Sequence, residues 1–235
     1  MSELPPINPY AAPQASFVPA PGGSQFQYRP LAGRALAVAI PLGLFCLFSL
    51  LAIVLGAGVG SSGQTMSEVW QDESPMTRND LLELGEGLAV LATIITLCFF
   101  LPQANRNSRA LTGESLRFSP ASTMWWFFVP FMNLVRPYQA VREIWQASTS
   151  GYQEAWFAKA APGWLRLWWG TWLAFNMLLR LTANMARRAA QAGGEPSSAE
   201  IVGLLGRLAG IVAAACLIVA VTRIASVQAK RYSAG

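Results

Sequence analysis

The sequence predicts an all-α integral membrane protein with four transmembrane helices, a short re-entrant or interfacial Trp-rich helix and an amphipathic helix. Three observations lead to this fold class. Charged residues make up only 12 % of the 235 residues, whereas soluble domains hold about 25 %. Hydrophobic residues make up 53 % of the chain. Four stretches are also apolar enough to cross a bilayer, which takes about 20 residues.

The first segment, residues 1–30, holds seven of the fifteen prolines, mixed with Gly, Ser, Gln and Ala. Such a composition buries too little apolar surface to offset the entropy lost when a chain becomes ordered. We therefore expect a disordered Pro-rich tail over 1–30, followed by a helical membrane domain over 31–235.

The four candidate spans cover about 35–60, 81–101, 163–181 and 201–222. With a cytoplasmic N-terminus, twelve Lys and Arg lie inside and four outside, and Arg207 lies in the last span. A fifth span would make the count eight and eight. Because cytoplasmic loops carry an excess of basic residues, we expect four spans with both termini cytoplasmic, and an acidic outer loop over 61–80.

An interfacial element over 119–148 contains a fifth apolar run, 121–135. Ser119 and Pro120 suit the N-cap and the first position of a helix, and Pro130 removes a backbone donor in the middle of the run. A helix from Pro120 to the end of the run would be about 24 Å long. The hydrocarbon core is roughly 30 Å thick, so re-entrant or interfacial placement fits better than a crossing.

The second half of this element, 133–148, has the pattern of an amphipathic helix. One face carries the polar residues Asn133, Arg136, Gln139, Glu143 and Gln146, and another carries Leu134, Tyr138, Val141 and Trp145. Two placements fit this pattern. The helix lies in the headgroup layer, or its polar face turns inward to partner the backbone of the re-entrant segment.

Several short runs in and around this element resemble one bacterial membrane family, catalogued as domain of unknown function 4328. They are Phe118-Ser119-Pro120, Trp125-Trp126-Phe127, Val129-Pro130, Asn133-Leu134, Arg136-Pro137-Tyr138, Arg142-Glu143-Ile144-Trp145 and Ala147-Ser148. Upstream, Ala104-Asn105-Arg106 and Arg109-Ala110-Leu111 are similar to the same family, and so is Trp168-Trp169-Gly170-Thr171-Trp172 downstream. The resemblance covers roughly 85–230. It implies a multi-pass protein of the bacterial cytoplasmic (inner) membrane, and it supplies candidate positions rather than a chemistry.

Twelve residues form a candidate structural or ligand network: Arg117, Trp125, Trp126, Pro130, Asn133, Arg136, Arg142, Glu143, Trp145, Trp168, Trp169 and Trp172. Glu143 is surrounded in sequence by arginines, so we expect its carboxylate to hold guanidinium groups together. Trp164, Trp168 and Trp172 recur at helical spacing. They either pack against the Trp125-Trp126 helix or line a groove for a lipid or an aromatic ligand.

Several ionisable residues lie in the predicted spans, among them Glu83, Glu86 and Arg207. Glu83 and Glu86 suit the positive end of the second span's dipole, and a cation-binding acidic vestibule is the alternative. Arg207 lies in the fourth span and Asn176 in the third, where interhelical hydrogen bonds are the usual role of such residues. A contact between Arg207 and Asn176 is one option.

Catalytic, metal and nucleic-acid functions find no support in the sequence. The chain has no His, the usual general base and commonest metal ligand. Cys46, Cys98 and Cys216 lie in separate apolar runs. The net charge of +5 is accounted for by the orientation of the spans. We expect a non-enzymatic structural, interaction or regulatory protein without a cofactor, in contact with the bilayer and with a protein partner or a second copy. The alternative is a small oligomeric channel or transporter that uses the broken helix 120–135.

Overall fold

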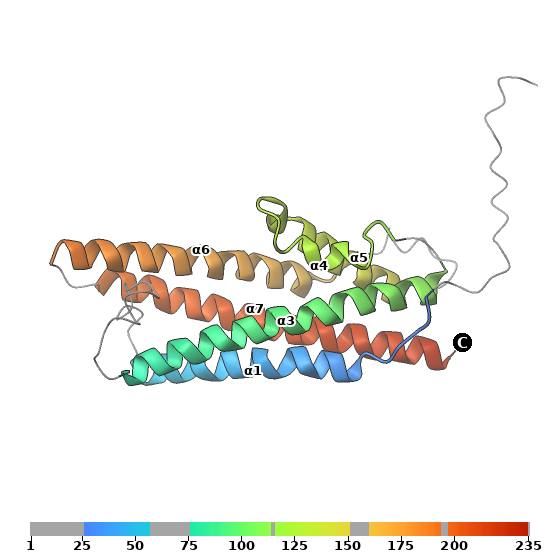
Figure 1. Ribbon diagram of the computed structural model, residues 1–235, viewed down its shortest axis with the longest axis horizontal. Coiled ribbons are helices and arrows are strands. Elements are labelled where there is room, and N and C mark those ends of the chain that lie inside the picture. The colour runs from blue at the N-terminus through green and yellow to red at the C-terminus, as the bar shows by residue number, and fades with distance from the viewer. Residues whose placement is uncertain (1–25, 57–75, 114–115, 151–159, 194–196, 235) are drawn as a thin grey trace, which may run out of the picture.

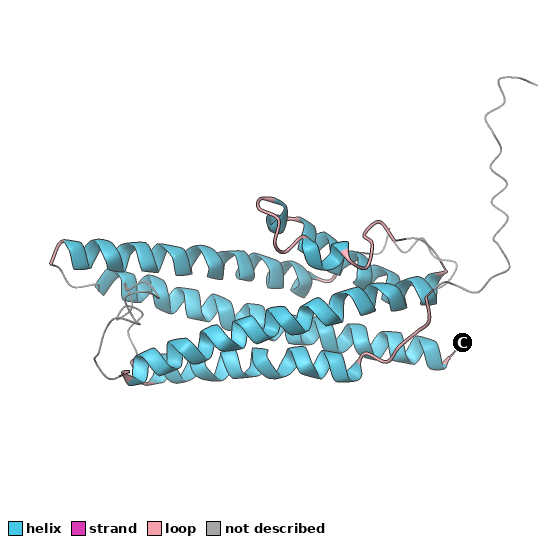
Figure 2. Cartoon of the chain, in the orientation of Figure 1, coloured by secondary structure: helices cyan, strands magenta, loops and turns pink. Residues whose placement is uncertain are grey.

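The computed structural model describes residues 26–56, 76–113, 116–150, 160–193 and 197–234. The helices are α1 (Ala32–Val54), α3 (Arg78–Thr112), α4 (Ser122–Trp125), the 3₁₀ helix η1 (Met132–Leu134), α5 (Arg136–Thr149), α6 (Gly163–Gln191) and α7 (Ser197–Ser233) (Figure 1). Within these ranges the chain forms only helices, turns and loops (Figure 2). The predicted disorder of 1–25 and most of the predicted acidic loop 61–80 lie outside the described residues.

The four long helices run side by side along one axis (Figure 1). α7 packs against both α1 and α6, while α3 packs mainly on α1. As a result, α3 and α6 border a space above the α1–α7 pair, and α4, η1 and α5 lie at one end of that space. The buried core runs along the contacts of α7 with its neighbours and includes Val38, Phe100, Leu165, Ala220 and Ile224.

Three of the described helices, α1, α3 and α7, are long and apolar enough to cross a membrane. The chain therefore has the make-up of a helical membrane protein, as predicted. α6 contains the predicted third span, 163–181, but it does not reach the same apolarity as the other three.

Three helices extend well beyond their predicted spans, and one of them, α6, continues past 181 to Gln191. α3 passes through Pro102 and ends only at Gly113, which has a φ of 69°, in the left-handed region that suits glycine. The expected end near 101 is thus wrong. The extension is stable because its polar side chains are buried against neighbouring helices, including Asn105 and Asn107, both 0 % exposed. α7 likewise continues past its predicted end to Ser233.

The Trp-rich segment differs from the predicted helix broken at Pro130. The helix α4 has only four residues and ends at Trp125, before the proline. Turns follow, and Phe131 adopts a φ of 60°, which is costly for a bulky residue. The amide of Met132 donates to the carbonyl of Pro130 (2.7 Å). The chain therefore reverses in a hairpin, residues 122–134, rather than continuing as a kinked helix.

The last residues of the predicted tail are held on the bundle. The Asn107 side chain accepts a hydrogen bond from the amide of Arg29 (3.0 Å) and donates to its carbonyl (2.7 Å). Tyr28 stacks on Tyr232 of α7, with ring centroids 4.2 Å apart. Ordered structure thus begins before residue 31.

Candidate functional site

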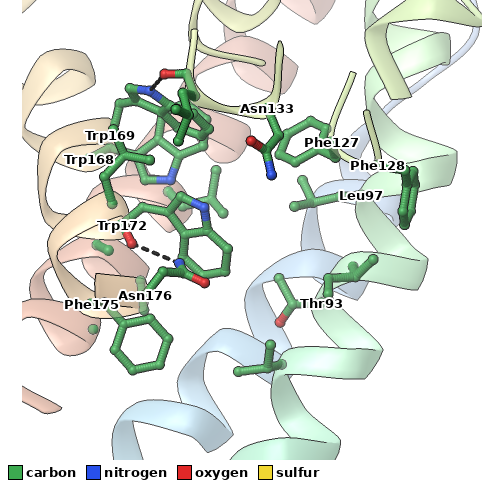
Figure 3. A pocket seen from close by; sticks show the side chains of 18 of the residues that line it. Thr93, Leu97, Phe127, Phe128, Asn133, Trp168, Trp169, Trp172, Phe175 and Asn176 are labelled. Carbon is green, nitrogen blue, oxygen red and sulfur yellow. Dashed lines mark hydrogen bonds between the residues drawn. The ribbon is translucent and has the colours of Figure 1, made fainter. Parts of the chain in front are cut away.

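A cavity of about 890 Å³ lies between α3 and α6, above α1 and α7 (Figure 3). We call it the groove. Its walls are mainly apolar and aromatic, with Leu97 on the α3 side and Trp172 and Phe175 on the α6 side (Figure 3). The volume lies within the range of small-molecule sites, roughly 300–1,000 Å³. The groove is therefore the candidate functional site.

The hairpin closes one end of the groove and is fixed to α6. Trp169 donates from Nε1 to the carbonyl of Leu134 (2.8 Å), and Phe127 meets the Trp169 ring edge-on at 6.5 Å. The Asn133 side chain points into the groove from the hairpin (Figure 3), and it has no hydrogen-bond partner among the described residues. Asn133 thus offers a free amide to a molecule in the groove.

Three other polar side chains line the groove. The Thr93 hydroxyl donates to the carbonyl of Ala89 (2.8 Å), and the Asn176 amide donates to the carbonyl of Trp172 (2.8 Å). Both of these bonds lie within one helix, so Asn176 does not meet Arg207. The third polar residue is Arg180, on α6. A largely apolar wall with a few polar groups is typical of a site for amphiphilic ligands.

A second cluster of predicted residues fixes the loop that leads into the hairpin. The two carboxylate oxygens of Glu143 accept hydrogen bonds from the backbone amides of Arg117 (2.6 Å) and Phe118 (3.1 Å). From the other side, Asn105 and Arg109 of α3 donate to the carbonyl of Phe118 (3.0 and 2.9 Å). Arg109 also donates to the carbonyl of Leu116 (2.9 Å). We call this arrangement, which holds residues 116–118, the loop clamp.

The expectation that Glu143 holds guanidinium groups together is wrong, because in the described chain it forms no ion pair within 4.0 Å. The Arg136 guanidinium instead lies over the rings of Phe118 (5.9 Å) and Trp126 (5.5 Å), and Arg142 is exposed. Burial raises the pKa of the Glu143 carboxyl, and the two backbone donors together with Arg109 and Arg117 oppose that rise. Of the polar face of α5, Glu143 and Gln146 are buried, at 6 % and 4 % exposed, and Glu143 partners the backbone of the loop that precedes the hairpin rather than that of the re-entrant segment.

The tryptophans of the predicted network lie in different parts of the structure. Trp168, Trp169 and Trp172 line the groove together with Pro130 and Asn133. Trp145 of α5 meets Trp164 of α6 edge-on at 5.0 Å. Trp125 is 59 % exposed and its ring pairs with Phe128, so the partner of the α6 tryptophans at the hairpin is Phe127 rather than Trp125 or Trp126.

A buried amide network was not anticipated from the sequence. Gln228 of α7 donates to the carbonyl of Ala104 (3.0 Å) and the hydroxyl of Ser148 (2.8 Å), and accepts from Asn107 (3.1 Å). Next to it, Arg231 donates to the carbonyl of Ala147 (2.8 Å). The available signal was the four-residue spacing of Gln103 and Asn107, whose side chains hydrogen-bond (2.9 Å). The network ties α3, α5 and α7 together.

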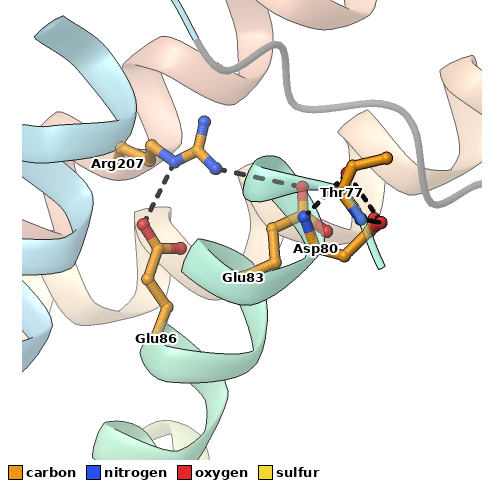
Figure 4. Close-up of polar contacts among 5 residues, drawn as sticks. All are labelled: Thr77, Asp80, Glu83, Glu86 and Arg207. Carbon is orange, nitrogen blue, oxygen red and sulfur yellow. Dashed lines mark hydrogen bonds and ion pairs between the residues drawn. The ribbon is translucent and has the colours of Figure 1, made fainter. Parts of the chain in front are cut away.

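The acidic residues of α3 have a partner that the sequence did not indicate (Figure 4). Arg207 of α7 lies 3.2 Å from Glu86 and 3.9 Å from Glu83. The acidic group in the first turn of α3 is Asp80, which accepts from the amide of Thr77 (2.8 Å) in a capping box. Glu83 and Glu86 therefore form an interhelical ion-pair cluster.

Comparison with known proteins gives one match. Residues 63–226 match the family described as Domain of unknown function (DUF4328). This range extends from before α3 to most of α7, and it contains the groove-lining hairpin and the loop clamp. No curated protein and no solved structure matches the chain significantly. Because the match covers more than half of the chain, the protein belongs to the DUF4328 family.

Proposed function

We propose that this protein is a non-enzymatic inner-membrane protein that binds a membrane amphiphile in the groove. The observation that carries this proposal is the groove itself, about 890 Å³ in volume and walled by apolar and aromatic side chains of α3, α6 and the hairpin. Within a bilayer, lipid acyl chains surround the protein. An apolar groove at the depth of the membrane-spanning helices therefore favours lipid-like molecules. The chain has no His, which favours binding over catalysis.

The proposal includes four crossings, with α6 as the third, and cytoplasmic termini. α6 has 29 residues and is thus about 43 Å long, more than the roughly 30 Å core. It lies along α7 for most of its length (Figure 1). The excess of basic residues on the side of both termini supports the orientation.

Retention of lipid by the purified full-length chain in mild detergent tests the proposal, with native mass spectrometry as the readout. Ile94→Trp with Met177→Trp adds bulk to groove-lining, exposed positions of α3 and α6. Leu91→Trp with Leu179→Trp is the matched control, since both leucines are exposed on the same helices outside the groove. We expect lipid adducts on the parent and the control, and their loss from the groove variant.

Equal lipid retention by both double variants, or none by the parent, would refute the proposal. The channel or transporter alternative is favoured by one observation, the irregular backbone of the hairpin at the groove. It predicts ion or solute flux in proteoliposomes that stops when the groove is filled, whereas a binding protein shows no flux in either form.

A further inference from the structure

The groove contains one fixed positive charge, Arg180. It lines the groove on α6, one helical turn beyond Asn176, and its side chain is exposed. Among the described residues it has no hydrogen bond and no carboxylate within 4.0 Å. Arg180 lies eleven residues after Trp169, hence about 16 Å farther along α6. The cation therefore lies far from the hairpin that closes the other end of the groove.

Two carboxylates of α3 are engaged by another arginine. Glu83 and Glu86 face Arg207 of α7, and Arg207 is only 6 % exposed. The backbone of Leu179 lies beside Gly206, so Arg180 and Arg207 are at a similar height in the bundle. Arg207 lies within ion-pair distance of both glutamates and offsets one of their two charges. Among the described residues no carboxylate lies within 4.0 Å of Arg180, which is therefore open to an anion in the groove.

The depth of Arg180 suits a lipid headgroup. It follows Gly163, the first residue of α6, by seventeen positions, which is about 26 Å of helix. In a hydrocarbon core of roughly 30 Å, this places the guanidinium near the boundary opposite the start of α6. Arginines at such a boundary reach the phosphate layer.

The size of the groove indicates how much chain accompanies that anion. At roughly 30 Å³ for a water-sized group, 890 Å³ holds about thirty methylene groups, which is two acyl chains of ordinary length rather than one. We propose that the groove binds an anionic phospholipid, an inference that rests on the proposed function. Its phosphate lies at Arg180 and its chains run toward the hairpin.

Competition between two lipids with identical acyl chains tests the inference. The full-length protein in neutral detergent receives equal amounts of phosphatidylglycerol and phosphatidylcholine, and native mass spectrometry gives the bound ratio. We expect the parent to prefer phosphatidylglycerol by about tenfold, because the choline ammonium of phosphatidylcholine offsets the phosphate charge that Arg180 would meet. Arg180→Gln should bring the ratio close to one, and Arg180→Lys should restore part of the preference.

Arg187→Gln is the matched control, because Arg187 is exposed two turns farther along α6 and donates to the carbonyl of Ala183 (3.3 Å) outside the groove. This variant should keep the preference of the parent. An unchanged ratio in Arg180→Gln, or no preference in a parent that binds both lipids, overturns the inference and leaves the proposed function standing. A parent that binds neither lipid overturns both. Displacement of phosphatidylglycerol by an equal concentration of oleate would show a single-chain anion and overturn the phospholipid assignment.

Discussion

At Glu143 a carboxylate is used to hold backbone rather than another side chain. Its two oxygens accept hydrogen bonds from the backbone amides of Arg117 and Phe118. The side chains of Arg109 and Asn105 donate to backbone carbonyls of the same loop. Buried backbone groups are costly when unpaired, so a handful of side chains sets the path by which the chain enters the hairpin. The amide of Gln228 has the same role at the ends of α3 and α5.

Glu143→Gln should destabilise the fold. The new amide nitrogen would face one of the two backbone N–H donors, leaving that buried donor unpaired at a cost of about 1–3 kcal/mol. Thermal unfolding in detergent measures the loss. Arg142→Gln, one residue earlier and exposed, should leave the midpoint unchanged. Equal midpoints for the two variants would show that the loop clamp contributes nothing to stability.

Gln228→Leu should be more harmful still, since it removes a side chain that is 0 % exposed and the hydrogen bonds that it forms with Ala104, Asn107 and Ser148. We expect a loss of at least about 2 kcal/mol, since each buried hydrogen bond contributes about 0.5–1.5 kcal/mol. Thr222→Val provides the comparison on the same helix, because the Thr222 hydroxyl bonds only within α7. If urea or heat unfolds both variants alike, the amide network is not stabilising.

Among the elements, the long helices and α5 were predictable, because runs of apolar residues and a polar face recur in the local sequence. The extension of α3 was not, since its amides are typical of a helix emerging into water. The bond that buries Asn107 comes from Gln228, 121 residues away. The break in the Trp-rich segment was predicted at Pro130, but the helix already ends at Trp125. The turn of the hairpin depends on Phe131 at a positive φ, a conformation that no local preference of phenylalanine indicates, and on the bond of Trp169 to Leu134.

The strain at Phe131 can be measured directly. The side chain is 84 % exposed, so Phe131→Gly loses little packing while it relieves a backbone conformation costing about 1–3 kcal/mol. We expect a raised unfolding midpoint. Phe128→Gly, in the same hairpin with an ordinary φ, should lower the midpoint because glycine adds backbone entropy there without relieving strain, and because the ring contact with Trp125 is lost. Two variants that are destabilised to the same extent would mean that Phe131 is not strained.

On the scale of the whole molecule, the topology depends on whether α6 crosses the bilayer. Gly163→Cys and Gln191→Cys mark the two ends of α6 at exposed positions, in a chain whose three native cysteines are replaced. With four crossings, an impermeant thiol reagent applied to intact cells labels Gln191→Cys and leaves Gly163→Cys unlabelled. Absence of label at both ends, with a cytoplasmic N-terminus, would mean that α6 lies along the inner surface, and the protein would have three crossings.

Because its helices differ in length, the protein is sensitive to the thickness of the bilayer. α1 has 23 residues, whereas α3 has 35 and α7 has 37, or about 34, 52 and 55 Å. The excess carries the exposed charges of Arg106 and Lys230, which hydrocarbon cannot cover at low cost. A thicker membrane therefore cannot be matched by sliding the bundle or tilting it, and the lipid beside α1 must thin instead, at fractions of a kcal/mol for each ångström of mismatch.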